Sequence, residues 1–189
     1  GYMFKAFYGG MNKLEVPAYT VVATPNARVV NDTPLVALDV PYILYICSGE
    51  RREGDFTQEI ENISDLHVIN VDIKIGGRHH DVTKEDVAQR LVDIAGSQQC
   101  KGILASVPCS TWSAARFNEK ECAPILRNLD HPCGIPGTDG ELPASVKEAN
   151  CILDATIKAV WAVTAHGGSY IFESPVSRCK GSPHAIPRR

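Results

Sequence analysis

A Pro-Cys pair followed closely by a tryptophan is the segment of this chain whose residue types are best suited to chemistry. Cys109 comes directly after Pro108 and the apolar run at 102–107, so it lies just past the end of a predicted strand. Most unpaired cysteines lie in protein cores, whereas one at a strand end is presented to a ligand or to solvent. A thiolate there can attack an electrophilic carbon. Trp112 either stacks on a ligand or packs against the protein, and a purely structural cysteine is the alternative.

Three acidic residues accompany other predicted elements. Asp72 closes a predicted strand, where nucleoside-binding folds place an acid that accepts hydrogen bonds from ribose hydroxyls. Glu173 ends an apolar run, so we expect its carboxylate to be partly desolvated and able to donate a proton or a hydrogen bond. Asp81 precedes a predicted helix and either contacts a ligand or caps that helix. A solvated acid at a strand end is the alternative for Asp72 and Glu173.

A glycine turn follows the first predicted strand. Ser48 and Gly49 come directly after the apolar run YILYIC. A glycine at a strand end lets the backbone approach a ligand closely. Such turns are also common where no ligand binds, so this feature counts mainly in combination with the others.

Alternating strands and helices must position these residues. The apolar runs predict strands at 42–47, 66–72, 102–107 and 169–174. Helical periodicity predicts helices at 83–97 and 145–168, with Thr83 and Ser145 as N-caps. This order predicts an α/β fold with a mostly parallel sheet and helices on both faces. Ligands bind such sheets at the carboxyl ends of the strands, so we expect the candidate residues to converge there.

The rest of the chain divides into a leader and one domain. Residues 1–40 form a leader whose structure the pattern does not predict, and 41–189 form the domain. Residues 108–144 are rich in proline and glycine, which predicts a long irregular segment, and such segments are often functional.

Composition narrows the classes of function. The net charge of −3 argues mildly against a strong grip on nucleic acid. The seven cysteines include no CxxC pair, which favours a reducing, intracellular compartment over a disulfide framework. No apolar run has the length of a membrane span, so we expect no membrane association. Cys122, His131 and Cys133 match no standard zinc spacing, and we predict no metal site.

Taken together and in order, these segments resemble the DNA (cytosine-5) methyltransferase family over roughly residues 41–178. The loop 108–113, PCSTWS, matches the family's Pro-Cys-Gln-x-Phe-Ser at the proline, the cysteine, the aromatic position and the final serine. Glu173 matches the glutamate of the family's Glu-Asn-Val motif, and YICSGERREGDF stands in the place of its glycine motif. The resemblance implies the Rossmann-like fold that binds S-adenosylmethionine.

The resemblance also implies roles for individual residues. Cys109 would add to carbon 6 of a cytosine, Glu173 would hold the ring nitrogen and the amino group, and Arg178 would stand in for an arginine that helps to bind the base. The base belongs to a nucleic acid, DNA more than RNA, and must be flipped out of a duplex. S-adenosylmethionine would supply the methyl group, in a pocket lined by Ser48, Gly49, Asp72, Asp81 and Pro108.

The chain departs from the family pattern in three places. The glycine motif lacks the usual acid, Ser174 replaces the asparagine, and we expect no separate target-recognition domain after Glu173. These departures favour an alternative, a catalytically inactive Rossmann-like binding or structural module, for instance one part of a larger polyprotein. A different enzyme on the same scaffold, such as one acting on RNA, is a third reading. A zinc deaminase is excluded, because Trp112 occupies the second cysteine position of its Pro-Cys-x-x-Cys motif.

Overall fold

Strands and helices alternate along the chain as the sequence predicts. The computed structural model describes residues 34–112, 124–128 and 130–173. The strands are β1 (Tyr42–Ile46), β2 (His67–Val71), β3 (Cys100–Ala105) and β4 (Ser169–Phe172), and the helices are α1 (Phe56–Ile63), α2 (Ile73–Gly76), the 3₁₀ helix η1 (Gly77–His80), α3 (Glu85–Ala95) and α4 (Ala144–Ala165). Each predicted strand lies within two residues of an observed one, so the α/β class is confirmed.

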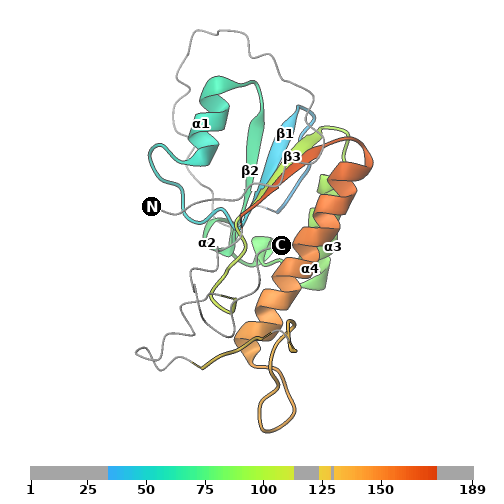
Figure 1. The fold of residues 1–189 in the computed structure, drawn as a ribbon. Coiled ribbons are helices and arrows are strands. Elements are labelled where there is room, and N and C mark those ends of the chain that lie inside the picture. The colour runs from blue at the N-terminus through green and yellow to red at the C-terminus, as the bar shows by residue number, and fades with distance from the viewer. Residues whose placement is uncertain (1–33, 113–123, 129, 174–189) are drawn as a thin grey trace.

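The four strands form one parallel sheet in the order β2-β1-β3-β4 (Figure 1). After β2 the chain crosses β1 to reach β3, so the strand order reverses between β1 and β3. Open sheets of this kind are compatible with a Rossmann-like fold and bind ligands at such reversal points. Ile46 pairs in register with Val71 on one side and with Ala105 on the other, so the carboxyl ends of these strands are level.

The side chains of β1 point alternately to the two faces of the sheet, and helices cover both faces. Tyr42 is fully buried, and its hydroxyl donates a hydrogen bond of 2.7 Å to the carbonyl of Ile94 in α3. Tyr45 points to the opposite face, where its ring meets that of Phe56 in α1 edge to face, with centroids 5.4 Å apart. The helices α3 and α4 pack side by side on the first face, and α1 lies on the second (Figure 1).

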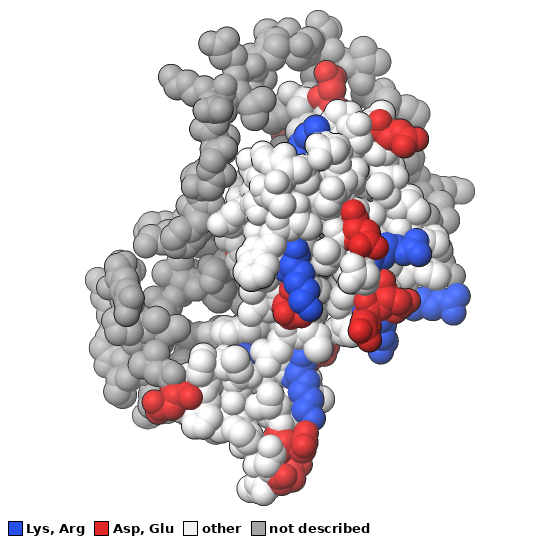
Figure 2. Space-filling model, turned by 90° about the vertical axis from the view of Figure 1, so that its right-hand side faces the viewer, with Lys and Arg blue, Asp and Glu red and all other residues white. Residues whose placement is uncertain are grey.

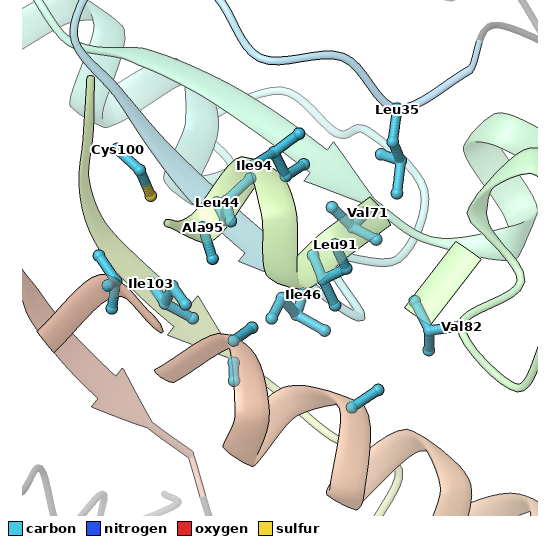
Figure 3. Packing of buried hydrophobic residues seen from close by; sticks show 14 of the residues in the cluster. Leu35, Leu44, Ile46, Val71, Val82, Leu91, Ile94, Ala95, Cys100 and Ile103 are labelled. Carbon is cyan, nitrogen blue, oxygen red and sulfur yellow. The ribbon is translucent and has the colours of Figure 1, made fainter. Parts of the chain in front are cut away.

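The core lies between the sheet and the α3–α4 layer (Figure 3). Leu44 and Ile46 of β1 meet Leu91 and Ile94 of α3 there, and all four are buried. Burying a side chain of this size stabilises the fold by about 1.5–3 kcal/mol. Leu35 belongs to the same core, so the core begins upstream of β1.

Both predicted helix caps are wrong. The helix α3 begins at Glu85, and the hydroxyl of Thr83 donates a hydrogen bond of 2.6 Å to Asp81 instead of capping the helix. The helix α4 begins one residue before Ser145, with Pro143 in the N-cap position and no side-chain cap. A neighbouring residue determines where each helix begins. Before α3 it is Asp81, which forms a turn with Thr83, and before α4 it is Pro143, whose φ is restricted.

Charges of both signs are interspersed on the face of α3 and α4, and no basic stripe crosses the described part of it (Figure 2). Lys158 and Asp154 on α4 form one such mixed pair, 2.7 Å apart. Within the described ranges, no helix is both long and apolar enough to span a bilayer. Because its charges are mixed, the face of α3 and α4 lacks the basic patch that binding of nucleic-acid phosphates needs. The strand ends are therefore the better candidate site.

Candidate functional site

The carboxyl ends of all four strands meet at one edge of the sheet. The residue after each of three strands donates its N–H to the carbonyl that ends a neighbouring strand: Cys47 to β2 at 2.8 Å, Ser106 to β1 at 3.0 Å, and Glu173 to β3 at 2.8 Å. The ladder thus continues one residue past the strands. The predicted convergence of the strand ends is confirmed, and the Cys109 segment leaves the sheet from this edge.

The turn after β1 is built from two residues in the left-handed region. Cys47 has φ 57°, and it is the one residue other than glycine with positive φ in the described part of the chain. Gly49 has φ 71°, and a Cβ added to it would meet no atom within 4 Å. The backbone conformation, rather than crowding, therefore requires the glycine. Burial, helped by the charge of Asp72, raises the pKa of Cys47 to about 12, so its thiol stays protonated near neutral pH.

The carboxylate of Asp72 closes this turn. It accepts a hydrogen bond of 2.9 Å from the backbone N–H of Gly49 and one of 2.8 Å from that of Lys74, so it joins the end of β1 to the start of α2. The two residues that the sequence assigned to a ligand therefore contact each other. Each carboxylate oxygen has a further lone pair, so Asp72 can still accept hydrogen bonds from ribose hydroxyls.

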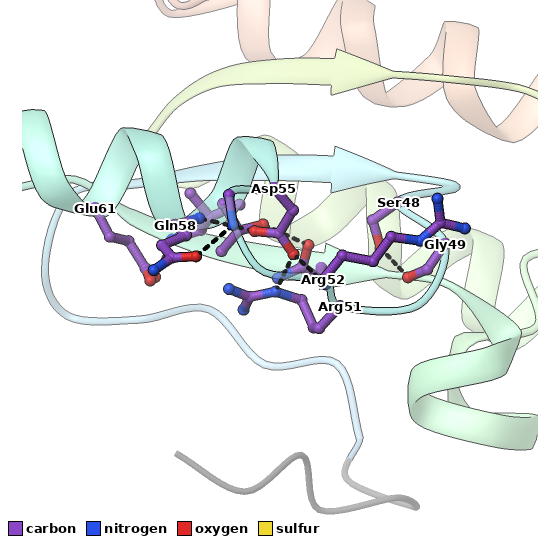
Figure 4. Close-up of polar contacts among 11 residues, drawn as sticks. Ser48, Gly49, Arg51, Arg52, Asp55, Gln58 and Glu61 are labelled. Atoms are coloured by element: carbon purple, nitrogen blue, oxygen red, sulfur yellow. Dashed lines mark hydrogen bonds and ion pairs between the residues drawn. The ribbon is translucent and has the colours of Figure 1, made fainter. Parts of the chain in front are cut away.

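The loop after Gly49 is anchored at the start of α1 (Figure 4). Asp55 accepts hydrogen bonds from the Arg51 side chain at 2.6 Å, from the N–H of Arg52 at 3.0 Å and from the N–H of Gln58 at 2.9 Å. Burial alone would raise the pKa of Asp55, but the bonds from Arg51 and the backbone outweigh it and lower that pKa. The hydroxyl of Ser48 donates to the carbonyl of Gly49 at 3.2 Å, so it too is engaged within the turn.

Asp81 lies in the turn that leads into α3. Its Oδ1 accepts hydrogen bonds from the Thr83 N–H at 3.1 Å and from the Thr83 hydroxyl, and its Oδ2 lies 4.0 Å from the ammonium of Lys84. Among the described residues, no hydrogen bond joins Asp81 to the strand-end groups. The local geometry therefore favours the turn-forming reading of Asp81 over ligand contact.

The ends of β3 and β4 are joined through side chains. The hydroxyl of Ser106 donates a hydrogen bond of 2.6 Å to Oε2 of Glu173. Glu173 is exposed, so the expectation that its carboxylate is desolvated is wrong. The reason is its place at the tip of β4, which forms one side of the described sheet. Ser106 was not among the residues predicted for the site, although a hydroxyl directly after an apolar run is a usable signal.

Cys109 is exposed in a tight turn beyond β3. The N–H of Trp112 donates a hydrogen bond of 2.9 Å to the carbonyl of Cys109, which closes the turn. Cys109 is three residues from Ser106, a stretch that spans at most about 11 Å. Pro108 is also exposed, and the thiol of Cys109 makes no hydrogen bond with any described residue. Arg178, the third expected catalytic residue, lies outside the described residues.

Trp112 packs against the protein rather than standing free. The guanidinium carbon of Arg127 lies 3.9 Å from the centroid of its ring. Arg127 was not predicted either, because a single arginine in the irregular segment 108–144 belongs to no motif. Among the described residues no cluster of His, Cys, Asp or Glu could hold a metal ion, and Cys122 lies outside them.

No family model, curated protein or solved structure matches this chain.

Proposed function

We propose that this chain is an S-adenosylmethionine-dependent methyltransferase domain that methylates carbon 5 of cytosine in nucleic acid, DNA in preference to RNA. The observation that carries the proposal is the hydrogen bond between Ser106 and Glu173. It ties the strand that leads to Cys109 to the strand that ends in Glu173. A nucleophile and a carboxylate that can hydrogen-bond to the base, presented from neighbouring strand ends, suit addition to a pyrimidine ring.

The chain's own residues would act as follows. The Sγ of Cys109 forms a bond to carbon 6, and the electron pair of the C5–C6 double bond moves toward carbon 5. Glu173, oriented by Ser106, holds the ring nitrogen and the exocyclic amino group and so favours this addition. After carbon 5 is methylated, a solvent water molecule takes the proton from carbon 5. The C–H electron pair re-forms the C5–C6 double bond, and the bond between Sγ and carbon 6 breaks with its electron pair going to the Cys109 thiolate. Both side chains are exposed, so a flipped base can reach them.

The donor would supply the methyl group as an electrophile. The turn at Ser48 and Gly49 would approach it through backbone, and Asp72 would accept hydrogen bonds from its ribose through lone pairs that the two backbone N–H groups leave unused. Pro108 would line the same pocket. The geometry at Asp81 gives weaker support to a contact with the donor, because its carboxylate serves the turn before α3.

A second function is favoured by one observation. The hydrogen bond between Gly49 and Asp72 gives both residues a structural role that needs no ligand. In that case the chain is a catalytically inactive Rossmann-like binding or structural module. The two functions differ in one measurable property, which is covalent attack by Cys109.

The deciding experiment offers the protein an oligonucleotide that contains 5-fluorocytosine, together with S-adenosylmethionine. Attack at carbon 6 must be reversed by removing the substituent at carbon 5, and fluorine cannot leave as a cation, so an active enzyme is trapped. We expect a covalent adduct that mass spectrometry maps to Cys109, and a DNA oligonucleotide should trap faster than its RNA counterpart. Glu173→Gln should slow trapping strongly while donor binding persists.

Two results would contradict the proposal. An adduct that maps to Cys100, which is fully buried, would refute the assignment of the nucleophile. Donor binding without any adduct would support the inactive module instead.

A further inference from the structure

The turn that carries Cys109 is attached to α4 by one buried arginine. Arg127 is 7 % exposed, and Thr111, in the middle of the turn, is 3 % exposed. The Nε of Arg127 donates a hydrogen bond of 3.1 Å to the Thr111 hydroxyl, and the guanidinium covers the ring of Trp112. The side chain of Arg127 therefore contacts two consecutive residues of the turn, Thr111 and Trp112, which follow Cys109 in the chain.

The same guanidinium is held from its other side. Its Nη1 donates 2.9 Å hydrogen bonds to the carbonyl of Pro132 and to Oδ1 of Asn150, and its Nη2 lies 3.5 Å from the carbonyl of Val146. Asn150 in turn donates to the carbonyl of Cys133 at 2.8 Å. Val146 and Asn150 lie one turn apart on α4, so the fork of the guanidinium is fixed to a long helix.

All the hydrogen-bond partners described for Arg127 are neutral. Burial lowers the pKa of Arg127, an effect that the nearby Cys133 thiol opposes, and an arginine remains charged even so. A buried cation without a described carboxylate partner is a poor choice for stability alone, because an apolar side chain would avoid the desolvation. Its planar guanidinium is suited to holding neighbouring groups in one arrangement. It donates hydrogen bonds to four acceptors and stacks on one aromatic ring at the same time.

We propose that Arg127 is a positioning residue that holds the Cys109 turn against α4, so that the thiol meets the target base at a fixed place. The inference rests on the proposed function, since it assigns Arg127 to the reaction of Cys109. The thiol itself has no hydrogen bond to any described residue, so the turn sets its position. Displacing a reacting atom by about 1 Å can slow a reaction about 100-fold.

The test compares Arg127→Met, Thr111→Val and the wild type. Lys158→Met is the control, because it removes an exposed cation from α4, the helix that Arg127 contacts. For Arg127→Met we expect trapping by 5-fluorocytosine to slow about 10- to 100-fold, with the dissociation constant of the donor unchanged. Alkylation of Cys109 by iodoacetamide should stay within about twofold, because the thiol is exposed in both proteins. Thr111→Val should slow trapping less, and the double variant should be no slower than Arg127→Met, because both changes act on one contact.

Fluorescence quenching tests the contact between Arg127 and the turn without any measurement of activity. The chain has two tryptophans, so Trp161→Phe leaves Trp112 as the only fluorophore of its kind. In that background Arg127→Met should raise the acrylamide quenching constant of Trp112 by about twofold or more, since the guanidinium no longer covers the ring. Lys158→Met should leave it unchanged.

The outcomes separate the two proposals. Trapping at the wild-type rate in Arg127→Met, or unchanged quenching of Trp112, overturns the positioning role. If Arg127→Met fails to fold, Thr111→Val decides, because wild-type trapping in that variant has the same meaning. If the wild type forms no adduct, the proposed function fails and the positioning role falls with it, while Trp112 quenching still shows whether Arg127 holds the turn.

Discussion

The two halves of the sheet edge are built differently. At the ends of β1 and β2, polar groups are satisfied by one another: Asp72 binds the N–H of Gly49, and the thiol of Cys47 is protonated and half-buried. At the ends of β3 and β4, Cys109 and Glu173 are exposed, and only Ser106 contacts the carboxylate among the described residues. The first half is closed, and the second half presents reactive groups to solvent.

This difference separates residues that maintain the fold from residues available for chemistry. A residue whose polar atoms are satisfied inside the protein affects stability when it is replaced, whereas an exposed residue affects it little. If the comparison is right, substitutions at β1–β2 change the free energy of unfolding, and substitutions at β3–β4 change reactivity.

The largest effect is expected at Cys109. Cys109→Ser should abolish the adduct with 5-fluorocytosine, because a serine hydroxyl is far less nucleophilic than a thiolate near neutral pH. The free energy of unfolding in urea should change by no more than about 0.5 kcal/mol, since the side chain is exposed. A loss of stability well above this value would assign Cys109 to the fold and erase the contrast between the two halves.

Asp72 should show the opposite behaviour. Asp72→Ala removes a charged acceptor from two backbone N–H groups, and we expect the free energy of unfolding to fall by about 1.5–3 kcal/mol. Asp154→Ala is a matched control, because it breaks only an exposed ion pair on α4 and should leave the free energy of unfolding nearly unchanged. Calorimetry with S-adenosylmethionine then shows whether Asp72 also binds the donor: equal affinities in wild type and variant limit it to a structural role.

Gly49 and Gly54 form a second matched pair. Both have positive φ, 71° and 67°, and a Cβ added to either meets no atom within 4 Å. Alanine at either position should therefore lower the free energy of unfolding by a similar amount, about 1–2 kcal/mol, through backbone strain alone. Only Gly49→Ala should also weaken donor binding. Equal donor affinity in both variants would leave the turn without a role in the site.

The sequence predicted the fold better than it predicted the site. The strands were predictable because apolar runs such as 42–47 and 102–107 are long enough to mark buried parallel strands. The convergence of their ends followed from the alternation of elements. The details were not predictable, because they depend on contacts between distant segments: Ser106 meets Glu173 across 67 residues, and Arg127 reaches Asn150 across 23. No local pattern encodes such partners.

The exposure of Glu173 shows the same limit. Its apolar neighbours suggested a desolvated carboxylate, but the degree of burial depends on what lies beside β4. Conversely, Thr83 and Ser145 have the local signature of N-caps, but the turn at Asp81 and the proline at 143 move the start of each helix by one or two residues. Local propensity is therefore a guide to the presence of an element and a weaker guide to its ends.

The smallest predicted effect concerns Cys47 and alkaline pH. In the unfolded chain a thiol ionises near pH 8.5, whereas Cys47 in the fold keeps its proton up to about pH 12. Its contribution to stability is therefore complete below about pH 8 and decreases as the pH rises toward 12, because only the unfolded state releases the proton.

Cys47→Ser removes this ionisation and leaves the left-handed backbone unchanged. Between pH 8 and 9.5 the variant should lose about 1 kcal/mol less unfolding free energy than the wild type, measured in urea under reducing conditions. The burial of Cys100, whose pKa rises to about 11, still gives the variant a residual slope. Identical slopes in the two proteins would mean that the Cys47 thiol ionises as readily in the fold as in the unfolded chain, and the β1–β2 half would then be as open to solvent as the half that carries Cys109.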